Sequence, residues 1–281
     1  MQTPIGRFYV MLAAVTLLFE GVGFARADEK PTEWSIYKNE NYQLFYKPER
    51  EKDAKKVLGF LDAGIASLKK EFAGFPADDL LRVNPVIYLH PKATDKASEY
   101  TTLITTGVDK GKYYAVIDLL TPLAYNPNYR NNINQPADDD HVHKLVMHEY
   151  STILLERITR AKKAGWTFFT APRWFTDGYE EYLGITCSSP RNRKEFVAKY
   201  LAKHKKVPAR IGFDFGLGVE DDYIDGSLLL LFMHETFGKK RVQAVLTNEE
   251  RRFGTAMARE LGIGLEEFKK RWDEWLKKKL N

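Results

Sequence analysis

The spacing of apolar residues predicts a first half that mixes strands and helix. Short apolar runs bounded by turn residues predict strands at 42–46, 84–89 and 113–119. Apolar residues that recur every three to four positions over 53–72 predict an amphipathic helix. The Asn- and Pro-rich stretch at 122–136 predicts an exposed loop.

The second half is dominated by helical patterns. A long one covers 141–161, and the aspartates at 138–140 suit its N-cap and first turn. Further helices are expected at 173–183, 193–204, 227–237, 240–246, 253–261 and 265–280. We therefore predict an α+β fold, with an α/β N-terminal lobe at about 35–165 and a helical C-terminal lobe at about 166–281.

The N-terminal segment is typical of a secretory signal peptide. Arg7 is followed by an apolar stretch at 8–19 and then by the small-residue pattern Ala25-Arg26-Ala27. The stretch is shorter than the roughly 20 residues of a membrane helix, and Glu20 interrupts it. We expect a signal peptide at 1–27 and an exported protein, periplasmic or secreted, with no stable membrane span. An uncleaved anchor is the alternative.

Composition narrows the range of functions. Hydrophobic residues make up 44% of the 281, enough for a sizeable core, and the net charge of +5 is too small to argue for nucleic acid. The single cysteine, Cys187, excludes an internal disulfide, and we interpret it as an inert, partly buried thiol. No motif indicates a serine or cysteine nucleophile, a nucleotide, haem or flavin.

The segment His148-Glu149-Tyr150-Ser151-Thr152 carries the main candidate chemistry. In the HExxH motif two histidines on one helix face bind zinc, and the glutamate acts as general base. Here the first histidine and the glutamate are present, and Thr152 stands at the second histidine position. A second His-Glu pair, His234-Glu235, also lacks a second histidine, and we interpret it as helix surface.

Later segments strengthen this candidate. They are PRWFTDGYEEYL at 172–183, DYIDGSL at 222–228, FMHETFG at 232–238, and a closing stretch with LGIGLEEF and WDEWL. Together with the His-Glu segment, and in this order, they resemble the peptidase MA-like family, the gluzincin zinc metallopeptidases, over about 40–281. The resemblance implies a gluzincin (zincin-like) fold, with a small mixed sheet and helices in the first lobe and a cleft beside the helical second lobe.

The resemblance also implies roles for individual residues. His148 matches the first zinc ligand, Glu149 the general base and Asp177 the third ligand, although Asp is one methylene shorter than the family's Glu. We expect the functional groups of His148 and Asp177 within about 5 Å of each other. Thr152 replaces the second ligand, and a threonine hydroxyl is a poor ligand for zinc.

Neighbouring residues add alternatives. Glu180 is either a substitute metal ligand beside Asp177 or, as the sequence favours, a surface charge. Glu181 is placed to orient His148 through its second ring nitrogen. Tyr223 matches a tyrosine of the family's late helix and is either an oxyanion stabiliser or a core residue.

A second cluster of acids and histidines precedes the long helix: Asp138, Asp139, Asp140, His141 and His143. It is either a surface metal site or, the interpretation we favour, an N-cap followed by solvated residues. Although His141 shares the helix face of His148, it lies two turns away, about 10.5 Å, too far to share one zinc ion.

These observations lead to one expected function and one alternative. We expect an exported peptidase MA-like protein whose zinc-peptidase activity is impaired or lost because Thr152 replaces a ligand, with weak or absent zinc binding. It would bind a peptide, a protein or a cell-wall component. The alternative is an active zinc-dependent peptidase that uses Glu149 as general base and a substitute metal ligand.

Overall fold

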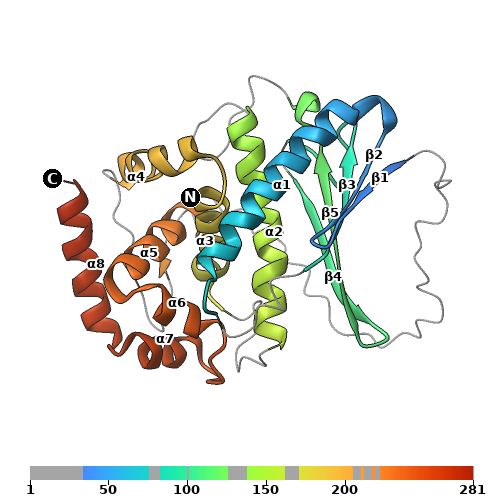
Figure 1. Cartoon of the computed structure of the whole chain (residues 1–281). Coiled ribbons are helices and arrows are strands. Elements are labelled where there is room, and N and C mark those ends of the chain that lie inside the picture. Colours follow the sequence, from blue (N-terminus) through green and yellow to red (C-terminus); the bar gives the residue numbers. More distant parts are fainter. Residues whose placement is uncertain are drawn as a thin grey trace, which may run out of the picture. The chain divides into compact units, whose positions relative to one another are not determined.

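The computed structural model describes residues 34–75, 83–99, 101–125, 138–161, 171–204, 210–211, 217–218 and 222–280. They belong to one compact unit, residues 34–281, and the predicted signal peptide lies outside the described residues. Within the described chain the unit contains a five-stranded mixed sheet and eight α-helices, which confirms the predicted α+β class (Figure 1). Of the loop expected at 122–136, only 122–125 are described.

The sheet combines parallel and antiparallel strands. Its order is β1 (Ser35–Lys38), β2 (Gln43–Tyr46), β3 (Val86–His90), β5 (Lys112–Leu120) and β4 (Leu103–Asp109). The central strands β2, β3 and β5 run parallel, while β1 and β4 are antiparallel to their neighbours. In the described part of the chain, β4 is therefore an edge strand.

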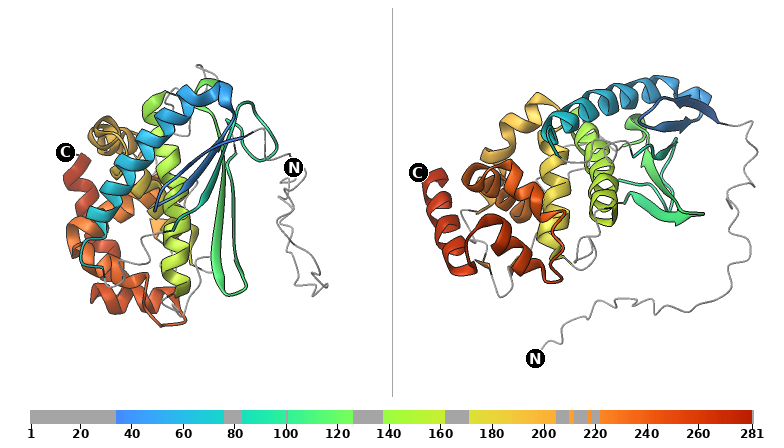
Figure 2. Two further views of the ribbon diagram at one scale, coloured as in Figure 1. Left: turned by 45° about the vertical axis from the view of Figure 1, so that its right-hand side comes forward. Right: turned by 60° about the horizontal axis from the view of Figure 1, so that its bottom comes forward.

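One face of the sheet is covered by α1 (Glu51–Glu71) and α2 (Asp139–Ala161), as two views show (Figures 1 and 2). Leu44, Ile87 and Ile117 lie side by side in register across the parallel strands, and all three are buried. Since side chains alternate between the faces of a strand, this row fixes which face meets the helices. Ile104 is the partner of Ile117 in the next strand, so Ile104 and Thr106 of β4 face α2 as well.

The edge strands β1 and β4 were not predicted from the sequence. Both are largely exposed, so they lack the apolar run that marks a buried strand. The hairpin from β4 to β5 turns through Lys110 and Gly111, which both have positive φ, as a two-residue type I′ turn requires.

The rest of the described chain is helical, apart from the short paired strands β6 (Arg210–Ile211) and β7 (Leu217–Gly218). The helices are α3 (Arg173–Thr186), α4 (Pro190–His204), α5 (Asp222–Phe237), α6 (Lys239–Val245), α7 (Phe253–Leu261) and α8 (Leu265–Leu280). All six overlap the predicted helices. None of the described helices is long and apolar enough to cross a membrane.

Helices α3 and α5 touch backbone to backbone at a pair of glycines. A Cβ atom on Gly226 would lie 2.2 Å from the carbonyl oxygen of Trp174, and one on Gly178 would lie 2.5 Å from the carbonyl carbon of Gly226. No larger residue fits at either position without moving a helix. This contact fixes the start of α5, where Tyr223 lies, against α3.

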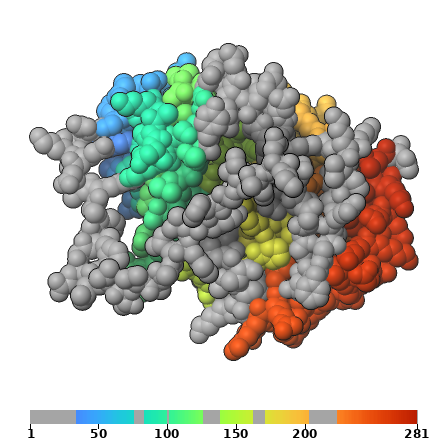
Figure 3. Space-filling model, turned by 180° about the vertical axis from the view of Figure 1, so that it is seen from behind, coloured from blue at the N-terminus to red at the C-terminus, as the bar shows by residue number. Residues whose placement is uncertain are grey.

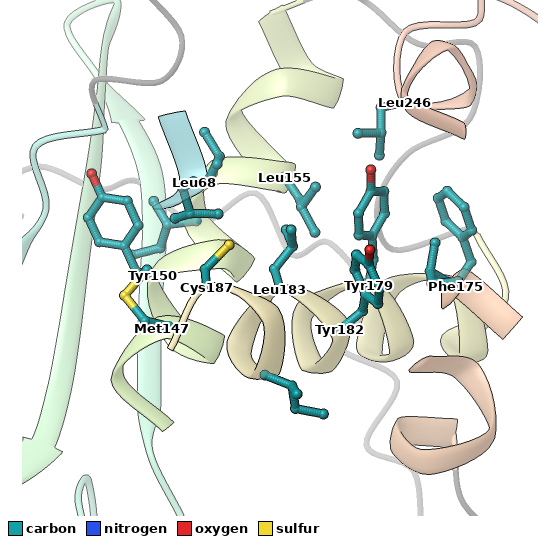
Figure 4. Packing of buried hydrophobic residues seen from close by; sticks show 14 of the residues in the cluster. Leu68, Met147, Tyr150, Leu155, Phe175, Tyr179, Tyr182, Leu183, Cys187 and Leu246 are labelled. Carbon is teal, nitrogen blue, oxygen red and sulfur yellow. The ribbon is translucent and has the colours of Figure 1, made fainter. Parts of the chain in front are cut away.

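The hydrophobic core continues from the sheet into the C-terminal helices. Leu68 of α1, Leu155 of α2, Leu183 of α3 and Leu246, which follows α6, all belong to one buried cluster (Figure 4). Cys187 joins it with 2% of its surface exposed. The expectation of a buried thiol is therefore confirmed.

Three histidines that were expected at the surface are largely buried. His141 and His143 do not follow the N-cap as solvated residues, because α2 is enclosed by α1, α3 and the sheet, and His143 stacks on Phe60 with ring centroids 4.8 Å apart. His234 packs against Tyr182, with ring centroids 4.7 Å apart. The N-cap itself is confirmed, since Asp138 Oδ1 accepts the His141 N–H at 2.9 Å.

Candidate functional site

Helices α2 and α3, which carry His148 and Asp177, pack side by side. A glycine permits the approach: a Cβ atom on Gly184 would lie 3.1 Å from both the Cβ of His148 and the carbonyl oxygen of Lys144. The polar residues of α3 are thereby brought against the His148 face of α2.

A cavity of about 820 Å³ opens beside this pair of helices. Strand β4, α2, α3 and the start of α5 form its walls, and the space-filling view shows the strands and α3 on either side of α2 (Figure 3). The cavity is lined by all the predicted site residues, namely His148, Glu149, Asp177, Glu180 and Tyr223, together with Thr152 and Glu181.

The imidazole of His148 lies between two carboxylates of α3. Its Nε2 atom is 3.4 Å from Oε2 of Glu180, and its Nδ1 atom is 3.2 Å from Oε2 of Glu181. The second contact is a close approach of charged atoms without the alignment of a hydrogen bond. Glu181 thus lies where the sequence placed it. Glu180 is only 6% exposed, so its interpretation as a surface charge is wrong.

Glu181 also binds two residues that were not predicted. Its Oε1 atom lies 2.6 Å from Nζ of Lys144, one helical turn before His148, and accepts a short hydrogen bond from the hydroxyl of Tyr200 on α4. The i, i+4 spacing of Lys144 and His148 is the only sequence signal for this network.

The two positions expected to complete a metal site are bonded within the protein. The Thr152 hydroxyl donates to the His148 carbonyl oxygen at 3.2 Å. Asp177 Oδ2 accepts hydrogen bonds from Arg173, from Nη2 at 2.6 Å and from Nε at 3.0 Å. The carboxylate that contacts His148 Nε2 is that of Glu180, and the expected approach of Asp177 to His148 stays a prediction.

Burial and neighbouring charges shift the pKa values of this cluster in opposite directions. Burial raises the pKa of Glu180 and Glu149, an effect that the nearby His148 only partly offsets. For Glu181, burial is outweighed by Lys144 and His148, so its pKa lies well below the usual range. Burial would lower the pKa of His148, but Glu181, Glu149 and Glu180 raise it above its ordinary value. A protonated His148 beside an ionised Glu181 is therefore the favoured state.

Tyr223 faces this cluster from α5. Its ring lies 5.6 Å from the imidazole of His148, centroid to centroid, and it lines the cavity. Burial raises the pKa of its phenol, and the nearby Asp177 and Glu180 add to the shift. At neutral pH the hydroxyl therefore keeps its proton and can donate a hydrogen bond to a ligand.

As arranged here, these side chains do not fit a zinc ion. A catalytic zinc takes three protein ligands, whereas Nε2 of His148 faces Glu180 and its Nδ1 faces Glu181. Glu181 is held by Lys144, and Asp177 by Arg173. Among the described residues, no group of three or more His, Cys, Asp or Glu side chains is placed to hold a metal ion. Metal binding by His148, Asp177 and Glu180 stays a prediction.

Two comparisons with known proteins identified no relative of this chain. A scan against protein-family models finds no match to this chain, and a search of curated proteins finds no significant similarity. The resemblance to the peptidase MA-like family therefore rests on the ordered segments of the sequence.

Proposed function

We propose that this protein is an exported, gluzincin-like member of the peptidase MA-like group whose cleft binds extended peptide segments without a catalytic zinc. One observation carries the proposal: the side chains of Thr152 and Asp177, which would complete a zinc site beside His148, are bonded inside the protein. Export rests on the signal-peptide pattern at the N-terminus.

The preference for peptide comes from the edge strand. Asp109 and Lys112 flank the two-residue turn and pair directly, so the N–H and C=O groups of Asp109 point towards β5. Since hydrogen-bonding directions alternate along an antiparallel strand, the N–H and C=O groups of Ile104, Thr106 and Val108 point to the open edge. An extended peptide can add to such an edge through main-chain hydrogen bonds.

The cavity beside this edge suits the side chains of an added peptide. Ile104 and Thr106 of β4 line the cavity, together with Glu149 of α2 and Tyr223 of α5. The volume of about 820 Å³ lies within the roughly 300–1,000 Å³ typical of ligand sites. Apolar and polar groups together allow a peptide to be recognised by both backbone and side chains.

Two variants at one position test this function. Thr106→Pro removes an N–H at the open edge, and proline is tolerated in edge strands, whereas Thr106→Val keeps the N–H. The probe is a fluorescein-labelled, permanently unfolded polypeptide, and the readout is fluorescence anisotropy. We expect binding by the wild type and the valine variant, and at least about tenfold weaker binding by the proline variant. Equal binding by all three would show that β4 is not the binding edge.

The same probe distinguishes binding from cleavage. With zinc present, we expect the polypeptide to stay intact during incubation with the purified protein. Cleavage that disappears in Glu149→Gln would favour the alternative of an active zinc peptidase with Glu149 as general base. A contaminating protease would leave the cleavage unchanged in that variant.

A further inference from the structure

We infer that Lys144 is a built-in cation that takes the electrostatic place of a metal ion beside His148. The inference rests on the proposed function, because a cleft that works without zinc still has buried carboxylates to neutralise. It assigns that task to a residue that lies outside the family motifs, and it predicts that restoring one histidine is not enough to restore a zinc site.

The burial of Lys144 requires an explanation. Only 6% of the residue is exposed, and lysine is almost never buried unless its charge is paired. Its partner is Glu181, with Nζ and Oε1 2.6 Å apart, and Tyr200 donates to the same oxygen. The ion pair joins α2 to α3, and the tyrosine brings in α4.

The position of Lys144 connects it to His148. The two residues are four positions apart on one face of α2, which corresponds to a rise of about 6 Å along the helix. The carboxylate of Glu181 spans this gap, with one oxygen on the ammonium and the other 3.2 Å from His148 Nδ1. In metal sites a carboxylate behind a histidine orients the ring towards the metal. Here the ammonium is the cation that fixes this carboxylate.

A fixed positive charge changes what else the cleft accepts. Lys144 lines the cavity together with Arg173, which is already paired with Asp177. A zinc ion at His148 would be repelled by the ammonium, and Glu181, the carboxylate nearest to Nδ1, is already neutralised. Of the other carboxyl groups near His148, Glu180 lies 3.4 Å from its Nε2, and burial raises the pKa of both Glu180 and Glu149, which favours their uncharged forms.

Zinc titration of matched variants tests the inference. Isothermal titration calorimetry with zinc alone compares Thr152→His with the double variant Thr152→His/Lys144→Gln, in which glutamine keeps a donor towards Glu181. We expect the double variant to bind zinc at least about tenfold more tightly, the scale on which groups behind the ligands alter affinity. Thr152→His/Lys55→Gln is the control, since Lys55 forms an exposed pair with Glu51, and it should match Thr152→His.

Several results would overturn the inference. Zinc binding by Thr152→His as tight as in the double variant would show that Lys144 is no barrier. An equal gain in zinc affinity from the Lys55→Gln control would show that the effect comes only from the change in net charge. Circular dichroism checks folding, and Thr152→His/Lys144→Met carries the same expectation should the glutamine variant not fold. Peptide binding is measured separately, so its failure would count against the proposed function and leave the zinc comparison intact.

Discussion

The hydroxyl of Thr152 donates a hydrogen bond to the carbonyl oxygen of His148, 3.2 Å away and one turn earlier on α2. Threonines inside helices commonly satisfy their hydroxyl in this way. The same hydroxyl interacts with the carboxyl group of Glu180, where it opposes the effect of burial on the pKa. Position 152 therefore acts as part of the helix wall of the cleft, next to an imidazole whose own partners are on α3.

The buried pair of Lys144 and Glu181 should dominate the response of the site to mutation. Glu181→Gln leaves a buried ammonium without its counter-charge, and we expect a loss of about 3–5 kcal/mol in the free energy of unfolding from urea titrations. Glu51→Gln, which breaks an exposed ion pair with Lys55, should change it by less than about 1 kcal/mol. A loss in Glu181→Gln no larger than in Glu51→Gln would show that the buried pair is not needed for folding.

Two glycine-to-alanine changes should have opposite effects on stability, because only one of the glycines lies at the contact between α3 and α5. Gly226→Ala places a methyl group 2.2 Å from the backbone oxygen of Trp174, and backbone cannot move aside as a side chain can. We expect a loss of at least about 3 kcal/mol in thermal unfolding. Gly59→Ala on α1 has open space around it and should gain about 0.5–1 kcal/mol. Similar melting temperatures for the two variants would contradict this packing.

His234 should make the protein less stable in mild acid. Burial, with a smaller effect of Lys239, lowers its pKa to about 4, although Glu71 lies 3.6 Å away. The native state thus holds His234 neutral, while the unfolded chain protonates near pH 6.5. Its contribution is complete above pH 6.5 and is lost as the pH falls towards 4, by an amount on the order of 1–3 kcal/mol. Unfolding titrations of His234→Gln should show a smaller decline over this range, and an unchanged decline would rule out this residue as its source.

Cys187 should be unreactive in the native protein. It is 2% exposed, and burial raises the pKa of its thiol to about 12, so almost no thiolate is available at pH 8. We expect less than about one tenth of the thiol to react with a disulfide reagent in the native state, and complete reaction in urea. Rapid native labelling would mean that the helices around Cys187 open readily.

The elements predicted from the sequence are those with a strong apolar period. Helices α1, α3, α7 and α8 each bury one face, and the spacing of their apolar residues indicates that face. The strands β1 and β4 bury too little to leave such a pattern. Helix α2 has the opposite property, because it is enclosed on nearly all sides, and its polar residues gave no indication of their burial.

The sequence predicted which residues belong to the candidate site, but it did not predict which of them bond to each other. The ordered segments indicated His148, Glu149, Asp177, Glu180 and Tyr223, and all five line the cavity. Arg173 and Asp177 are spaced i, i+4, so their pair could have been read from the sequence. The link from Lys144 to Glu181 joins residues 37 positions apart and depends on the distance between two helices, which no local pattern encodes.

The open edge of β4 has a consequence for solubility. An exposed edge strand is a template for a second copy of the same chain as well as for a ligand. Leu103 is 42% exposed and Val108 is 58% exposed along this strand, and the charges of Asp109, Lys110 and Lys112 protect only its far end. A bound peptide would cover the backbone groups through which two copies pair. We therefore expect a bound peptide to reduce aggregation in concentrated solution.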